Sequence, residues 1–188
     1  MKCKLLTDQM QYAGSGVERS PGLHLSDVIR EIGQELGMVP KDGENSGWDL
    51  PLAGEVGFLW EDVLGSVLGY RAGTRPGEVV VDGIAGSPDG IEWESTGKPI
   101  LAEYKATWKS VRNGDPSDNW KWMVQVKGYC YMISKAYNLH CNRVRFRVLH
   151  INGDYKPPSP KYREWLLTFT KRELQENWDM ILNHANRK

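Results

Sequence analysis

The chain has 188 residues, of which 40% are apolar and 26% charged, and its formal net charge is zero. This length fits one domain, expected over residues 1–188 with its core at about 24–185, and the composition is that of an ordinary globular protein. No apolar run approaches the roughly 20 residues that a membrane-spanning helix needs, and the N-terminus lacks the apolar segment of a secretory signal. We therefore expect a cytoplasmic protein without a membrane partner. Three widely spaced cysteines argue against a disulfide framework and against thiolate metal sites.

Charge is divided unevenly along the chain. Residues 1–97 carry 7 Lys or Arg and 16 Asp or Glu, whereas residues 98–147 carry 10 and 3. A basic middle beside an acidic front is consistent with a polyanion-binding surface next to an acidic site. Chance segregation on a solvated surface explains the pattern equally well, so charge alone does not decide between them.

Two helices are predicted in the first third of the chain. The first covers residues 24–37, with Ser26 as its expected N-cap and apolar residues on one face. The second covers residues 52–69 and has a wide apolar face. Along it, Gly57, Glu61 and Gly65 follow one another at i, i+4 and i+8. Glycines on either side of a carboxylate leave space around it, which favours close approach of another group.

A β segment is predicted over residues 77–91, with Asp82 as a turn residue, and a strand over residues 98–107. Alternation along this second strand places Glu103 and Lys105 on one face and Tyr104 on the other. A long helix follows at residues 119–138, capped by Asp118 or Asn119.

The remaining elements are two strands and a final helix. Residues 143–148 alternate arginine with apolar residues, and residues 163–170 form the last strand. Thr170 and Glu173 make a capping box for the C-terminal helix. The order α, α, β, β, α, β, β, α predicts a mixed α/β domain whose small central sheet is flanked by helices.

The stretch "GSPDGIEWESTGKPILAEYKAT" carries the chemistry. Asp89 follows a turn-forming proline, and Glu103 comes 14 residues later, so pairing of the two strands lets both carboxylates converge. Hard oxygen ligands suit Mg²⁺ or Mn²⁺, and the backbone carbonyl of Tyr104 is a plausible further ligand. Lys105 offers a compact positive charge for a phosphate or an attacking water.

Three more residues complete this constellation. Glu61 is expected to reach a metal-bound water from the opposite side, and Gln125 and Tyr129 lie one helical turn apart on the next helix. Taken singly, each of these features is more often a turn, a solvated strand face or the edge of a core. Their joint occurrence in this order is what favours a site.

The series Glu61, Pro88-Asp89, Glu103-Tyr104-Lys105 and Gln125-x-x-x-Tyr129 resembles the PD-(D/E)xK nuclease superfamily. Within it, the series is most similar to the branch of lambda exonuclease, the YqaJ-type viral recombinases and the RecB nuclease domain. The resemblance covers about residues 55–148. It implies a restriction-endonuclease-like core, a mixed sheet between helices.

The resemblance also implies roles for the matched residues. Asp89 and Glu103 would bind one or two Mg²⁺ or Mn²⁺ ions, with Tyr104 and Glu61 as further metal ligands. Lys105 would be the catalytic lysine, and Gln125 and Tyr129 would complete the site. DNA would be the substrate, a single-strand annealing protein and further copies of the chain would be partners, and a phage-encoded protein would act in the host cytosol.

Several residues near the site are candidates for DNA contacts. Four are basic and two are tryptophans that border a polar loop: Lys109, Arg112, Lys121, Lys127, Trp108 and Trp120. The arginines of strand 143–148 either bind phosphates or pair with acids of the N-terminal half, and the sequence favours neither.

Together these features predict a metal-dependent deoxyribonuclease, in first place a phage-type exonuclease that degrades DNA from its ends. Two alternatives stay open, a structure-specific endonuclease and a catalytically silent nucleic-acid-binding adaptor with the nuclease fold.

Overall fold

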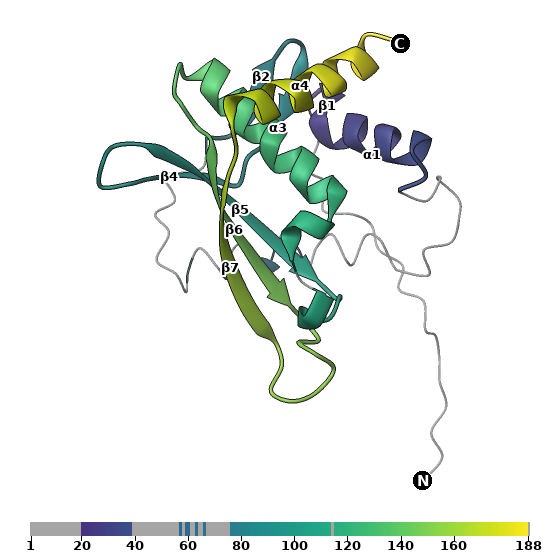
Figure 1. Cartoon of the computed structure of the whole chain (residues 1–188), viewed down its shortest axis with the longest axis vertical. Helices are drawn as coiled ribbons and strands as arrows, with labels where there is room; N and C mark the ends of the chain where they lie inside the picture. The colour runs from purple at the N-terminus through teal and green to yellow at the C-terminus, as the bar shows by residue number, and fades with distance from the viewer. Residues whose placement is uncertain are drawn as a thin grey trace.

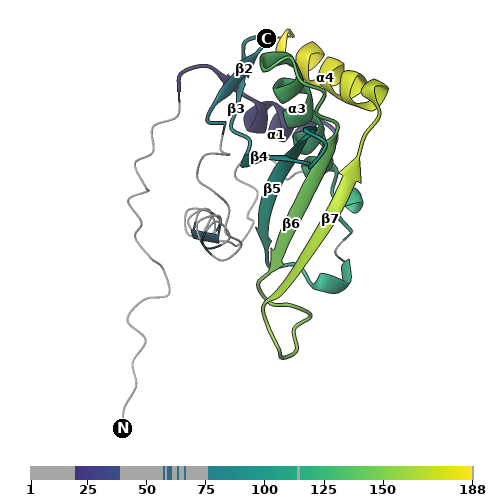
Figure 2. The same ribbon diagram turned by 90° about the vertical axis from the view of Figure 1, so that its left-hand side faces the viewer.

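The computed structural model describes residues 20–38, 76–113 and 115–187, together with the single positions 57, 59, 60, 63 and 66. Within this part of the chain, three α-helices accompany two β-sheets, which confirms the mixed α/β class (Figure 1). The helices are α1 (Leu25–Glu35), α3 (Trp120–Ala136) and α4 (Lys171–Ala185). In both overall views they gather near one end of the longer strands, and the β6–β7 connection projects at the other end (Figure 2).

A small sheet has the strand order β1-β3-β2. Its strands are β1 (Leu23–His24), β2 (Val79–Val81) and β3 (Ile84–Gly86). Asp82 and Gly83 join β2 to β3 with φ angles of +51° and +78°, a conformation typical of a tight hairpin turn. The prediction of Asp82 as a turn residue is confirmed. Its carboxylate also accepts a hydrogen bond of 2.8 Å from the Trp178 indole of α4, which fixes the hairpin to that helix.

The larger sheet has the order β4-β5-β6-β7. Its strands are β4 (Gly90–Trp93), β5 (Pro99–Thr107), β6 (Arg143–His150) and β7 (Lys161–Thr168). The β5–β6 pair is parallel, with α3 in the connection, and the other two pairs are antiparallel. The expectation of one central sheet was therefore incomplete. The chain leaves β3 through Ser87 and Pro88 before β4 begins, so the predicted segment 77–91 divides between two sheets.

Helix α3 is central to the packing, because it contacts β2, β5 and β6 as well as α1 and α4. Its Gly128 faces Leu25, and a Cβ there would lie 3.0 Å from Leu25 Cδ2, so the missing side chain permits a close crossing of α1 and α3. The predicted cap Asn119 accepts a hydrogen bond from Trp122 N. The Thr170–Glu173 capping box of α4 is also present.

Two helical predictions need comment. The predicted N-cap Ser26 is wrong, because α1 begins two residues earlier than that cap implies, with His24 at the N-cap position and no side-chain capping bond. Most of the predicted helix 52–69 lies outside the described residues, although the five described positions within it are helical. Over residues 20–38, 76–113 and 115–187, no helix has the length and hydropathy needed to cross a bilayer.

Candidate active site

The β4–β5 hairpin brings the two predicted metal-binding carboxylates to one place. Gly90 is the first paired residue of β4 and its partner is Ala102, so Asp89 lies next to Glu103 at the end of this ladder. The backbone N–H of Tyr104 donates a hydrogen bond of 2.8 Å to Asp89 Oδ2. That bond fixes one oxygen of the carboxylate and explains why an acid directly after Pro88 can be held against a strand 15 residues away.

Glu103 and Lys105 form a close ion pair on the face of β5 that points toward α3. Lys105 Nζ donates to Glu103 Oε1 at 2.5 Å. The Glu103 side chain is 1% exposed, whereas that of Lys105 is 21% exposed. A buried carboxylate is costly unless it is paired, and here strand alternation supplies the counter-ion two residues away. Lys105 therefore reaches from a buried anion toward solvent.

The protonation state of Lys105 follows from opposing effects. Burial lowers the pKa of its amine, but the negative charges of Glu103 and Asp89 raise it more strongly, and the net pKa lies above the usual value. Lys105 is therefore an ammonium ion at neutral pH. The effect of Asp89 on this pKa also indicates that all three charged groups share one neighbourhood.

Helix α3 contributes a hydrogen-bonded pair to the same neighbourhood. Gln125 Nε2 donates to the Tyr129 hydroxyl oxygen at 3.1 Å. Burial, followed by the charge of Glu103, raises the pKa of Tyr129, so the phenol keeps its proton. Because its oxygen already accepts from Gln125, the O–H of Tyr129 remains a donor for an anionic group.

Gly86 allows Tyr129 to approach the hairpin. A Cβ on Gly86 would lie 2.9 Å from Met132 Sδ and 3.0 Å from Tyr129 Cε1. Gly86 was not predicted to contribute to the site. Its small size in the stretch that precedes Pro88-Asp89 was the available signal, but the helix that it contacts is 43 residues further along the chain.

The residues present fit a hard divalent cation. Asp89 and Glu103 supply carboxylate oxygens, and both raise the pKa of Tyr129 and of Lys105, so the site has a negative potential that favours a cation. Within the described ranges, no group of three or more His, Cys, Asp or Glu is arranged to hold a metal. Glu61, the third predicted acid, lies outside the described residues.

The residues predicted to contact DNA lie in different parts of the structure. Lys121 keeps much of its surface exposed, but partial burial of its amine, followed by the charges of Lys105 and Arg30, lowers its pKa, so both of these cations lie near it. Arg30 on α1 was not predicted, because nothing in its own helix indicates the proximity to Lys121 at the start of α3. Lys109 is exposed on the loop after β5, and Arg112 lies 3.7 Å from Asp154.

Three other candidates have different partners. Lys127 Nζ lies 5.2 Å from the centre of the Phe169 ring, two residues along α3 from Gln125. Trp120 is half-buried against the core. Trp108 is exposed, and its carbonyl accepts a hydrogen bond from the Tyr155 hydroxyl.

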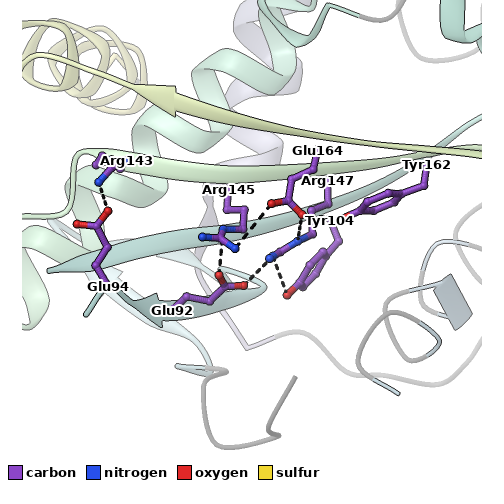
Figure 3. A network of polar contacts seen from close by, with 8 residues as sticks. All are labelled: Glu92, Glu94, Tyr104, Arg143, Arg145, Arg147, Tyr162 and Glu164. Atoms are coloured by element: carbon purple, nitrogen blue, oxygen red, sulfur yellow. Dashed lines mark hydrogen bonds and ion pairs between the residues drawn. The ribbon is translucent and has the colours of Figure 1, made fainter. Parts of the chain in front are cut away.

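The opposite face of the sheet carries the arginines of β6, and they are engaged by carboxylates (Figure 3). Arg147 is 1% exposed and donates to Glu92 at 2.7 Å and to Glu164 at 3.1 Å. Arg145 contacts the same two glutamates, and Arg143 pairs with Glu94.

Aromatic residues complete this network. The Arg147 guanidinium lies 5.4 Å from the centre of the Tyr104 ring, and the Tyr162 hydroxyl donates to Glu164. Of the two predictions for the arginine strand, pairing with acids is the one that the contacts bear out, with Glu92 and Glu94 from the N-terminal half and Glu164 from the C-terminal half. The network therefore stabilises the β4–β7 sheet from behind while the candidate site occupies the other face.

Comparisons with known proteins bear on the fold. No protein-family model matches the chain, and no curated protein does. Among solved structures, the alkaline exonuclease LHK-Exo from Laribacter hongkongensis is 15% identical, with a TM-score of 0.50, over 86% of this chain and 77% of that one. LHK-Exo in complex with dAMP is 14% identical, with a TM-score of 0.53, over 88% of this chain and 87% of that one. At these identities the likeness concerns the fold alone: the chain has the mixed α/β fold of these nuclease structures.

Proposed function

We propose that this protein is a metal-dependent deoxyribonuclease, in first place an exonuclease that hydrolyses phosphodiester bonds from DNA ends. The observation that carries the proposal is the convergence of Asp89, Glu103 and Lys105, with Gln125 and Tyr129, on one face of β5. The fold shared with an alkaline exonuclease, and the dAMP that this neighbour binds, support the same reaction class.

Each residue has a role that follows from its surroundings. Asp89 and Glu103 would hold Mg²⁺ or Mn²⁺, with the Tyr104 carbonyl and Glu61 as further ligands. A bound Mg²⁺ supplies a Lewis acid at the scissile phosphate. Lys105, held as an ammonium by its acidic neighbours, balances the negative charge that develops on the phosphate oxygens during in-line attack by water.

Gln125 and Tyr129 orient a hydrogen-bond donor toward the site. Gln125 fixes the Tyr129 oxygen, so that the phenolic hydrogen is directed toward an anionic acceptor, either a carboxylate of the site or a phosphate oxygen. A neutral phenol with a raised pKa donates a hydrogen bond without giving up its proton. We assign Gln125 as a positioning residue on this basis.

The test uses one DNA sequence as a linear duplex and as a covalently closed circle. Both are incubated with the protein in Mg²⁺, in Ca²⁺ and in EDTA. We expect Mg²⁺-dependent loss of the linear form with the circle intact, binding without turnover in Ca²⁺, and no cleavage in EDTA. Cutting of the circle would indicate an endonuclease, and an absence of cleavage in both Mg²⁺ and Mn²⁺ would contradict the proposal.

A further inference from the structure

A pocket lies beside the proposed active site. It has a volume of about 350 Å³, within the range of small-ligand sites. Thr107 lines it and belongs to β5, two residues after Lys105 and on the same face, which corresponds to a distance of about 6.8 Å along the strand. Asn119, at the N-cap of α3, lines it as well. The pocket is therefore built on the two elements that carry the site.

Of the three aspartate and lysine side chains at this pocket, Asp115 accepts hydrogen bonds from Ser117, and the other two are not engaged by the rest of the described structure. Asp118 and Lys109 both line it. Within residues 20–38, 76–113 and 115–187, neither side chain makes a hydrogen bond or ion pair. One carboxylate acceptor and one ammonium donor are thus available to a ligand.

His150 is a buried polar group at the same pocket. It is 1% exposed, and its Nδ1 lies 3.0 Å from the Lys109 carbonyl oxygen. Because a carbonyl only accepts, Nδ1 carries a hydrogen, and Nε2 of the neutral ring is an acceptor. Among the described residues Nε2 has no hydrogen-bond partner, which is uncommon for a buried ring nitrogen. The pocket wall therefore contains a polar group that the protein itself does not complete.

Two aromatic side chains give the pocket flat apolar surface. Trp122 is half-buried, and its ring packs 5.4 Å from that of Phe146. Tyr155 is 67% exposed, and its hydroxyl donates to the Trp108 carbonyl at 3.3 Å. Stacking on such rings is the common way to bind an unpaired base.

We propose that this pocket binds an unpaired nucleobase of the DNA strand whose backbone lies at Lys105. The inference rests on the proposed nuclease function and adds to it a single-stranded character of the substrate next to the scissile phosphate. The two aspartates that line the pocket, Asp115 and Asp118, disfavour a phosphate there. A carboxylate instead accepts from the exocyclic amino group of cytosine, adenine or guanine, which thymine lacks.

The test is a cleavage ladder on a single-stranded oligonucleotide with one abasic position. In the wild-type protein, we expect the phosphate at one fixed distance from the lesion to be cleaved at least fivefold more slowly than in the intact strand. Tyr155→Ala should be slower on the intact strand and lose this extra effect, because the stacking partner is already gone. Tyr155→Phe keeps the ring and should retain the effect. Tyr137→Ala, another exposed tyrosine remote from the pocket, should behave as wild type.

Base identity gives a second readout. With cytosine in place of thymine at the affected position, wild type should cleave faster, and Asp118→Asn should reduce or reverse that preference.

Normal cleavage with no position-specific lesion effect, or a lesion effect that persists in Tyr155→Ala, would overturn the proposed base pocket while leaving the nuclease proposal intact. If wild type cleaves no DNA, the nuclease proposal fails. The affinity of each protein for the oligonucleotide in Ca²⁺ then tests the base pocket on its own. Equal affinities of wild type and Tyr155→Ala would overturn the pocket as well.

Discussion

At the scale of single residues, the site depends on a carboxylate and an ammonium that are side by side but differ in burial. Glu103 is enclosed, whereas Lys105 reaches solvent, and the two are joined at 2.5 Å. The lysine thus has two roles, as counter-ion for a buried acid and as the charge presented to substrate. Removing it affects stability as well as chemistry, because breaking a buried pair leaves a charge without one of its partners.

This coupling predicts a double-mutant result. Lys105→Ala should lower the free energy of unfolding by about 2 kcal/mol, the scale of a hydrogen bond to a charged group. Lys105→Ala combined with Glu103→Gln should recover part of that loss, since the acid is then neutral. Urea denaturation of wild type, Lys105→Ala, Glu103→Gln and the double variant measures the loss and its recovery. Additive losses in the double variant would contradict the coupling.

At the scale of elements, the site is made where β3, the β4–β5 hairpin and α3 meet. Gly86 provides the closest approach, since its Hα occupies the space beside Tyr129 and Met132. Asn119 sets the start of α3, and therefore the rotational position of Gln125 and Tyr129 on it. A small glycine and a helix cap, both common local features, thus bring together side chains that are far apart in sequence.

Gly86→Ala tests this packing. The new methyl must displace Met132 or Tyr129, so we expect a loss of about 1–3 kcal/mol in stability and slower cleavage by the folded protein. Gly128→Ala is the matched control, because its Cβ meets Leu25 of α1 instead. It should lower stability while leaving the cleavage rate per folded molecule unchanged. Equal cleavage by both variants would show that Gly86 does not position Tyr129.

Much of this arrangement was predictable from local sequence. Alternation along residues 98–107 correctly placed Glu103 and Lys105 on one face, because side chains in a strand have period two. Asn119 and the Thr170–Glu173 box were recognisable because capping depends on residues only a few positions apart.

Long-range contacts were not predictable in the same way. The division of residues 77–91 between two sheets depends on which strands pair with them. One of those strands, β1, comes from more than 50 residues earlier in the chain. The ionic network of β6 depends on the register of β4 and β7 against it, so the arginines alone left two interpretations. The pocket beside Thr107 brings together residues from Thr107 to Tyr155, and no local pattern marks it.

At the scale of the whole molecule, the two faces of the larger sheet carry different electrostatics. The face toward α3 has Lys105 and Lys121 near the site, with Lys109 on the following loop. On the opposite face, the arginines of β6 are neutralised by Glu92, Glu94 and Glu164 (Figure 3). Lys109 and Lys121 therefore lie beside the acidic site, whereas the arginines of the opposite face are paired with acids.

Salt dependence of DNA binding separates the two faces. In Ca²⁺, the logarithm of the association constant should fall linearly with the logarithm of salt concentration. Lys109→Ala combined with Lys121→Ala should reduce the magnitude of that slope by about 2, one for each lost phosphate contact. Arg145→Ala, on the opposite face, should leave it unchanged. If Arg145→Ala reduced the slope more than the double lysine variant, DNA would bind to the arginine face of the sheet, which would contradict this account.

The central claim is that the acids of the β4–β5 hairpin serve metal-dependent DNA cleavage, and Asp89→Asn tests it most directly. Asparagine retains an oxygen that can accept from Tyr104 N, so the hairpin should keep its structure while the carboxylate is lost. The measurement is the initial rate of Mg²⁺-dependent degradation of an end-labelled linear duplex by wild type, Asp89→Asn and the control Asp179→Asn, which alters a surface acid of α4. We predict a fall of at least about a hundredfold for Asp89→Asn and no change for Asp179→Asn. Cleavage by Asp89→Asn at the wild-type rate would contradict the account.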